Sequence, residues 1–330
     1  MRAVRVTRLD GPDAVELGEV DDPRPGTEDV LIDVVSAGVA YPDVLATQGR
    51  YQVQPQPPFV PGFEVAGVVA AAPAGSPLRP GDRVAAVPHF GGFAERVAVD
   101  RRLVFPLPDR MPFAQGAGAL FNYMSVDYAL VRRGRLRAGE TVLVHGAAGG
   151  VGTAAVQLAR ALGARVVAVV STAEKAGIAA ASGAHDVVPV DRFKDDVLTL
   201  TGGLGVDVVL DPVGGDRFAD SLRCLKPEGR LVVVGFTGGA IPTVAVNRLL
   251  NRDVEVIGSA WGRAWFLDRE HLSDQWIRLS PLFDSGALEV AVSTAYPLDQ
   301  ASAALCALAD RRAGGKVLLT VTEEGDRGIR

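Results

Sequence analysis

The sequence predicts an α/β protein in which a barrel-type β domain is followed by a doubly wound parallel sheet. Short apolar runs broken by glycine and proline fill the first hundred or so residues, which is typical of a small β domain. From about Asn122, Val- and Leu-rich runs alternate with helical segments, as in a parallel sheet covered on both faces. At 330 residues the chain exceeds one typical core and suits two domains.

The β domain is predicted from four strand-like runs and one loop. Met1–Val6 alternates like a first strand, and Val30–Val35, Val65–Val69 and Arg83–Val87 are apolar runs of strand length. Gln52–Pro61 is rich in proline but is embedded in apolar sequence, so we expect a rigid wall and not a linker.

The second domain is predicted from an unbroken series of strands and helices. Its later elements are Val187–Val188, Phe193–Leu200, Val206–Leu210, Phe218–Leu225, Leu231–Val234 and Val254–Ile257. The last predicted elements have no sheet of their own to complete. They are a helix near 268–285, a strand near Val290, a helix over 299–311 and a strand over 316–321. We expect them to return to the first domain, which gives domains of 1–121 with 262–330 and of 122–261, and a cleft between the two.

The most informative run is Val142–Gly152, an apolar strand that leads through a glycine-rich turn into a helix. Apolar residues recur at helical spacing until Gly163, and Arg165–Val170 supplies the next strand. This is the strand-turn-helix-strand unit of a Rossmann dinucleotide site, although Ala147 replaces its first glycine. An ordinary glycine-rich turn is the alternative. The predicted cofactor-binding residues here are Ala148, Gly149, Gly150, Val151 and Gly152, with Gly149 admitting the pyrophosphate and Gly152 the close packing of the helix.

The end of the second strand favours NADP over NAD. An NAD site places a carboxylate there for the ribose, but this chain has Ser171 and Thr172, followed by Lys175. Hydroxyls and an ammonium suit a 2′-phosphate. The alternative is that Ser171 caps the helix with Glu174 as its capping-box partner, while Lys175 is solvated.

Composition favours small-molecule chemistry. The net charge of −5 is mild and the basic residues are scattered, so we expect neither nucleic acid nor an anionic membrane as a partner. No signal peptide or long apolar run is visible, which predicts a cytoplasmic protein. Cys224 and Cys306 lie in apolar helical surroundings and are expected to be buried, reduced thiols.

The order of domains and a set of motifs together resemble the medium-chain dehydrogenase/reductase superfamily. The motifs are Pro61–Gly67, Gly81–Val84, Gly91–Glu95, Val142–Gly152, Asp211–Gly215 and Gly315–Val317. Over essentially the whole chain they are similar to the zinc-independent, zeta-crystallin-like quinone oxidoreductases. The resemblance implies a GroES-like first domain, NADPH as cofactor and a homodimer, with the sheet edge near Val254–Ile257 as its interface.

The residues predict that no zinc is bound. Phe63 stands where the zinc enzymes of this superfamily place a histidine ligand, and Ser36–Ala40 contains no cysteine. The four histidines are scattered and unaccompanied by cysteine. Without a Lewis acid, oxidation of alcohols is not expected.

The resemblance also implies the residues at the reacting centre. Backbone groups of Phe236 and Ser259 are candidates for the nicotinamide carboxamide. Asn122, Tyr123, Ser125 and Lys316 match segments that contact the cofactor in related enzymes. Phe63 and Phe93 are candidate walls of the acceptor pocket.

Two tyrosines are candidate acids. Tyr51 matches a tyrosine proposed to assist protonation in related enoyl thioester reductases. Ala40 replaces the usual pocket asparagine of the quinone reductases, and Tyr41 beside it is a candidate substitute. The alternative is that both rings are apolar walls, and Asp43 is expected to be a turn residue or helix cap.

Three functions follow from these observations. The first is an NADPH-dependent reductase that transfers hydride to an electron-poor small molecule, a quinone or an α,β-unsaturated carbonyl, since such acceptors need no metal activation. The second is a 2-enoyl thioester reductase. The third is a non-catalytic NADPH-binding protein, because a fold alone does not imply turnover.

Overall fold

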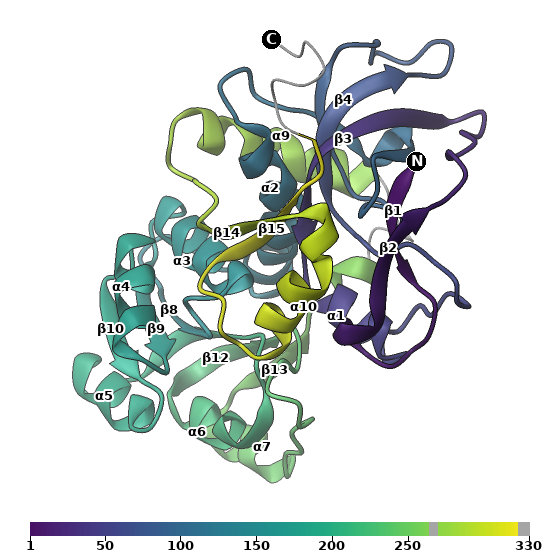
Figure 1. Cartoon of the computed structure of the whole chain (residues 1–330). Coiled ribbons are helices and arrows are strands. Elements are labelled where there is room, and N and C mark those ends of the chain that lie inside the picture. The colour runs from purple at the N-terminus through teal and green to yellow at the C-terminus, as the bar shows by residue number, and fades with distance from the viewer. Residues whose placement is uncertain (264–269, 323–330) are drawn as a thin grey trace. The chain divides into compact units, whose positions relative to one another are not determined.

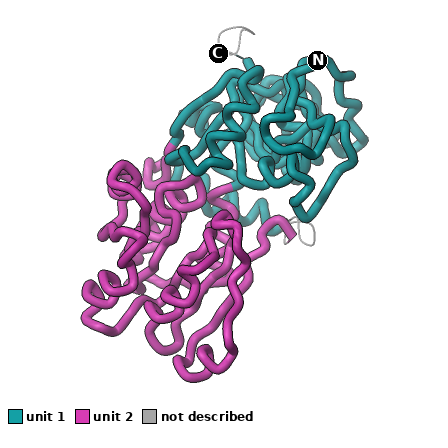
Figure 2. The backbone as a smooth tube through the Cα atoms, turned by 60° about the horizontal axis from the view of Figure 1, so that its bottom comes forward, with its two compact units in different colours: residues 1–121, 268–284, 292–330 teal, residues 122–267, 285–291 magenta. Residues whose placement is uncertain are grey.

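The computed structural model describes residues 1–263 and 270–322 (Figure 1). The chain divides into two compact units, coloured separately in Figure 2. Unit 1 comprises residues 1–121, 268–284 and 292–330, and unit 2 comprises residues 122–267 and 285–291. No helix among the described residues is both long and apolar enough to cross a bilayer.

Unit 2 is built on a six-stranded parallel sheet, as predicted. Its order is β10-β9-β8-β11-β12-β13, and every neighbouring pair is parallel. The strands are β8 (Thr141–His145), β9 (Arg165–Val170), β10 (Asp186–Pro189), β11 (Val206–Asp211), β12 (Leu225–Val233) and β13 (Glu255–Gly258). The order reverses between β8 and β11, and the carboxyl ends of strands at such a switch point are where α/β sheets bind ligands.

Helices cover this sheet and close its core. They are α3 (Gly150–Ala161), α4 (Ala173–Ala181), α5 (Phe193–Leu200), α6 (Phe218–Arg223) and α7 (Asn247–Arg252). Phe193 of α5 and Leu222 of α6 are buried in one apolar cluster with Val209 of β11. The central strands are buried on both faces, which explains why their sequences are nearly continuous runs of Val and Leu.

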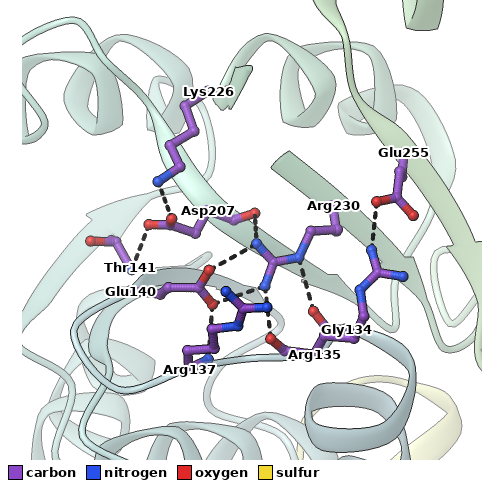
Figure 3. Close-up of polar contacts among 9 residues, drawn as sticks. All are labelled: Gly134, Arg135, Arg137, Glu140, Thr141, Asp207, Lys226, Arg230 and Glu255. Atoms are coloured by element: carbon purple, nitrogen blue, oxygen red, sulfur yellow. Dashed lines mark hydrogen bonds and ion pairs between the residues drawn. The ribbon is translucent and has the colours of Figure 1, made fainter. Parts of the chain in front are cut away.

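A network of charged residues ties together the opposite, amino ends of these strands (Figure 3). The Arg230 guanidinium donates to both oxygens of Glu140, at 2.8 and 3.0 Å, and to the carbonyl of Gly134 at 2.9 Å. Asp207 accepts from the N–H of Thr141 at 2.9 Å and pairs with Lys226. This network therefore lies at the end of the sheet away from the switch-point loops.

Unit 1 contains a seven-stranded sheet in the order β14-β15-β3-β4-β5-β7, with β6 also paired to β3. The strands are β3 (Asp29–Val39), β4 (Val65–Ala71), β5 (Arg83–Ala86), β6 (Arg96–Asp100), β7 (Val104–Pro106), β14 (Val292–Pro297) and β15 (Lys316–Thr320). A separate antiparallel pair joins β1 (Arg2–Val6) to β2 (Val15–Glu19). Because β15 pairs with β3, the C-terminal elements do return to the N-terminal β domain, as predicted.

Four further α-helices lie among the described residues. They are α1 (Tyr41–Thr47), α2 (Phe113–Asp127), α9 (Glu270–Asp284) and α10 (Ala301–Ala309). The division between the units falls within α2, between Phe121 and Asn122. The helix predicted over 268–285 is α9, and residues 268–269 lie outside the described part of the chain.

Two expectations are corrected by the fold. Residues 285–291 group with unit 2 and not with the β domain, because the backbone of Glu289 exchanges hydrogen bonds of 2.7 and 2.9 Å with the side chain of Gln157 on α3. Cys224 is buried and free as expected, but Cys306 is only partly buried and donates to Asp13 Oδ1 at 3.1 Å.

Candidate functional site

The glycine-rich turn lies at the carboxyl end of β8, directly before α3. A Cβ at Gly152 would lie 2.1 Å from the carbonyl oxygen of Gly146 and 2.6 Å from Cα of Ala147, so only glycine fits there. The first turn of α3 is thereby packed directly against the loop that precedes it. This is the packing role predicted for Gly152, and it brings the backbone of residues 146–152 into one tight turn.

The start of α3 presents backbone donors without a capping side chain. Gly149 is its N-cap, and its carbonyl accepts the first helical bond from Thr153 N–H at 2.8 Å. The N–H groups of Gly150, Val151 and Gly152 point out of the first turn, where they and the helix dipole favour an anion. Ala148 is buried immediately before the cap.

Asn122 is brought to this turn from α2. A Cβ at Gly150 would lie 2.6 Å from Asn122 Nδ2, so the buried amide lies directly against the start of α3. Ser125 is buried one turn further along α2. Tyr123 has a structural role, because its hydroxyl lies 2.8 Å from Gln157 Oε1 and 2.9 Å from the carbonyl of Glu289.

The end of β9 carries hydroxyls and no carboxylate. Thr172 is the N-cap of α4, and its Oγ1 accepts from Lys175 N–H at 3.2 Å. The alternative in which Ser171 caps this helix is therefore excluded, and Ser171 lies exposed in the preceding turn. The Thr172 hydroxyl can still donate a hydrogen bond, since its cap uses only an acceptor lone pair. Glu174 is exposed on the first turn of α4.

The loops after β12 and β13 only partly match the predicted carboxamide site. Ser259 N–H donates to the carbonyl of Val233 at 2.9 Å, which extends β13, so this N–H cannot hold a ligand as expected. The Ser259 hydroxyl is instead buried, and no described residue forms a hydrogen bond with it. Phe236 is 38% exposed, and its carbonyl accepts from Gly239 N–H at 2.8 Å.

Lys316, a predicted cofactor ligand, forms a buried ion pair within unit 1. Its Nζ lies 2.7 Å from Glu64 Oε2, and the two side chains are 3% and 0% exposed. The other oxygen of Glu64 accepts from Phe121 N–H at 2.8 Å. Burial raises the pKa of Glu64, and the Lys316 charge opposes this shift. A Cβ at Gly38 would lie 2.7 Å from Glu64 Oε2, so glycine is needed beside the pair.

Glu64 was missed as a site residue in the sequence, where it stood only as part of the Pro61–Gly67 motif. Its partner is 252 positions away, so no local pattern could connect the two. The sequence did offer one signal, because the Glu64 carboxylate stands in an otherwise apolar, strand-forming run, where a buried charge usually has a partner.

Aromatic rings surround Phe63 in unit 1. Its ring centroid lies 5.1 Å from Tyr51, 4.9 Å from Phe90 and 6.0 Å from Phe121. We refer to these four residues as the aromatic cluster. Burial is the main cause of the raised pKa of Tyr51, and the charge of Asp43 raises it further. Phe93 is fully buried and supports the neighbouring loop, since its N–H donates to the carbonyl of Pro61 at 2.9 Å.

Asp43 joins the start of α1 to the loop that carries Phe63. Its Oδ2 accepts from Ala40 N–H at 2.8 Å, which confirms the expected helix cap, and its Oδ1 accepts from Gly62 N–H at 2.9 Å. The carboxyl group is 0% exposed, and burial raises its pKa to about 7. Tyr41, the first residue of α1, is half-buried.

The described residues contain no group of three or more His, Cys, Asp or Glu side chains arranged to hold a metal ion. His145 is a core residue, with Nε2 2.8 Å from Ser221 Oγ and its ring against Phe193. Burial lowers the pKa of His145 to about 3, so it is neutral in the folded protein.

Comparison with known proteins agrees with this geometry. Residues 26–109 match the family model "Alcohol dehydrogenase GroES-like domain" and residues 150–282 match "Zinc-binding dehydrogenase". The chain is 36% identical over 304 residues to Quinone oxidoreductase-like protein 2 of Bos taurus, covering 91% of this chain and 87% of that one.

Solved structures give the same result. A probable oxidoreductase from Mycobacterium abscessus superposes with a TM-score of 0.91 at 41% identity, over 97% of this chain and 99% of that one. Escherichia coli quinone oxidoreductase, solved in complex with NADPH, also gives a TM-score of 0.91, at 29% identity over 97% and 100% of the two chains. The chain is thus an oxidoreductase of the medium-chain dehydrogenase/reductase superfamily and belongs to its zinc-independent quinone oxidoreductase branch.

Proposed function

We propose that this protein uses NADPH to reduce a quinone or an α,β-unsaturated carbonyl compound, without a metal ion. The observation that carries the proposal is the turn at 146–152, where glycine is required at Gly152 and the start of α3 presents uncapped N–H groups. The NADPH complex of the similar Escherichia coli enzyme supports the choice of cofactor.

Residues of unit 2 fit the parts of NADPH. Residues 148–152 would hold the pyrophosphate through backbone N–H groups, with the Asn122 amide beside them. Ser171, Thr172 and Lys175 would hold the 2′-phosphate, because the end of β9 has no carboxylate to repel it. Phe236 and Ser259 remain the candidates for the carboxamide, and Ser259 would contribute its buried hydroxyl.

Residues of unit 1 would serve the acceptor. When bound, NADPH supplies the hydride. The half-buried rings of the aromatic cluster, packed against the buried Phe63, would give the acceptor an apolar surface that excludes water. The raised pKa of Tyr51 keeps its hydroxyl protonated at neutral pH, so it can donate a hydrogen bond to the oxygen on which negative charge develops. Tyr41 is the second candidate donor.

The direct test follows the loss of reduced-nicotinamide absorbance with NADPH and NADH in parallel, using 1,4-benzoquinone and a 2-enoyl-CoA as acceptors after treatment with a chelator. We expect chelator-resistant turnover of the quinone with NADPH preferred. Turnover that is abolished by the chelator and restored by zinc would contradict the metal-free proposal. NADPH binding without turnover of either acceptor would favour the non-catalytic alternative.

A 2-enoyl thioester reductase is the second candidate, and the placement of Tyr51 favours it. Its ring packs edge-on against Phe63, and its hydroxyl is the candidate proton donor for the reduced product. Turnover of the enoyl-CoA but not the quinone, lost in Tyr51→Phe, would select this function.

We further propose that the protein is a homodimer formed along β13. This strand ends the sheet of unit 2, and three exposed apolar side chains precede it, Ile241, Val246 and Leu250. An unpaired edge strand flanked by exposed apolar residues favours pairing with a second copy.

A further inference from the structure

Asp211 is the last residue of β11, and its carboxylate is fully buried at the carboxyl edge of the sheet. Its Oδ1 accepts from the N–H groups of Val213 and Gly214, at 2.9 and 2.8 Å. Its Oδ2 is buried and has no hydrogen-bond partner among residues 1–263 and 270–322. Oδ1 therefore determines the path of the chain after β11, while no hydrogen bond from a described residue offsets the burial of Oδ2.

The segment shaped by Asp211 supports the loop after β12. Pro212 O accepts from Thr237 N–H at 3.1 Å, and Val213 O accepts from Gly238 N–H at 2.8 Å. In return, Gly215 N–H donates to the carbonyl of Ala240 at 3.1 Å. Residues 212–215 and 234–240 thus form one hydrogen-bonded layer.

The same segment reaches the glycine-rich turn on its other side. A Cβ at Gly146 would lie 3.1 Å from Val213 Cγ2, so the two loops are nearly in contact. Gly214 and Gly215 have φ values of +67° and +76°, a conformation that other residues rarely adopt. Such a path must be held by specific bonds, and Asp211 makes two of them.

We propose that Asp211 is a positioning residue that sets loop 234–240 relative to the phosphate-binding turn at 146–152. The proposal rests on the proposed function, in which these two loops hold the two halves of NADPH. Asp211 itself touches neither half, because both of its oxygens are buried beneath the loops.

The design compares Asp211→Ala with Asp211→Asn and with a matched control. Asparagine keeps the Oδ1 acceptor, replaces Oδ2 with an amide nitrogen and removes the negative charge that interacts with Arg217. Asp207→Ala is the control, because Asp207 lies at the other end of the same strand and also accepts from a backbone N–H. Asp207 is not part of the proposed site.

In Asp211→Ala we expect the Kd for NADPH to rise about tenfold or more, since two hydrogen bonds to a carboxylate are lost. In the same variant, the Kd for 2′-phospho-ADP-ribose, which lacks nicotinamide, is expected to change less than about threefold. The Kd of Asp211→Asn and of Asp207→Ala for NADPH should also change less than about threefold. Equal weakening by both alanine variants would overturn the proposal, because it would indicate a general loss of stability.

Amide hydrogen exchange without cofactor separates this proposal from the proposed function. We expect faster exchange at Thr237 and Gly238 in Asp211→Ala, but not in Asp211→Asn or Asp207→Ala. Unchanged exchange in Asp211→Ala would overturn the positioning role. If exchange is faster in Asp211→Ala but the wild-type protein does not bind NADPH, the positioning role of Asp211 is retained and the proposed cofactor is rejected.

Discussion

At the scale of single residues, close approach of backbone atoms limits which side chains the turn at 146–152 tolerates. Gly152 is the clearest case, since a Cβ there would overlap the carbonyl oxygen of Gly146. In Gly152→Ala we expect the Kd for NADPH to rise more than about tenfold, because the turn must open to admit the methyl group. Gly177→Ala is the matched control, as a Cβ at this helical glycine meets nothing within 4 Å. Fluorescence titration of folded protein measures both, and unchanged affinity in Gly152→Ala would reject the assignment of the turn.

Asp43 gives a prediction for stability against pH. Burial raises its pKa in the folded protein to about 7, above its ordinary value of 3.8. The folded state therefore binds the proton more tightly than the unfolded state, and stability falls as pH rises from about 4 to about 7. Between pH 5 and pH 7 we expect Asp43 to lower the free energy of unfolding by about 2 kcal/mol.

Urea unfolding of the wild type and Asp43→Asn at both pH values isolates this contribution. The difference in unfolding free energy between the two proteins should shift in favour of the variant as pH rises, because asparagine does not titrate. A difference that is the same at pH 5 and pH 7 would show that Asp43 has an ordinary pKa.

At the scale of elements, the Lys316–Glu64 pair joins β15 to the residue before β4, and Glu64 also holds α2 through Phe121 N–H. Lys316→Met leaves a buried carboxylate unpaired, so we expect it to lower the free energy of unfolding by about 3 kcal/mol or more. The double variant Lys316→Met with Glu64→Gln should recover most of this loss, because glutamine keeps an acceptor for Phe121.

NADPH titration of the same variants decides between the two roles of Lys316. A structural role predicts that the double variant binds NADPH nearly as well as the wild type. Weak binding by a stable double variant would instead restore Lys316 to the cofactor site.

At the scale of the whole molecule, the proposed dimer depends on the exposed apolar side chains that precede β13 in the sequence. Val246 and Leu250 are 73% and 80% exposed and lie four residues apart, so they share one face. We expect Leu250→Glu to yield a monomer by light scattering, because a charge would be buried in the contact. Leu204→Glu is the control, since Leu204 is equally exposed, at 76%, but far from β13 in the sequence. A dimer that persists in Leu250→Glu would exclude this interface.

Local patterns were sufficient to predict all six strands of unit 2 and part of unit 1, whereas β2, β6, β7 and α2 were not predicted. Each buried strand of unit 2 is a short Val- and Leu-rich run, and the turn before α3 needs its glycines for reasons that act within a few residues. The return of the C-terminal strand was predictable because those elements had no sheet to complete. The strands and the turn depend on neighbouring residues, and the return of the last strand follows from the absence of a sheet of its own, so the sequence by itself determined these features.

Only the tertiary structure decided which groups meet. Lys316 forms an ion pair with Glu64, and Asp43 accepts a hydrogen bond from Gly62 N–H. Ser259 N–H donates to the carbonyl of Val233, and Gln157 donates to the carbonyl of Glu289 in segment 285–291. Each of these contacts links residues far apart in the chain or depends on sheet register. Their energies arise from burial and precise hydrogen-bond geometry, which no run of neighbouring residues records.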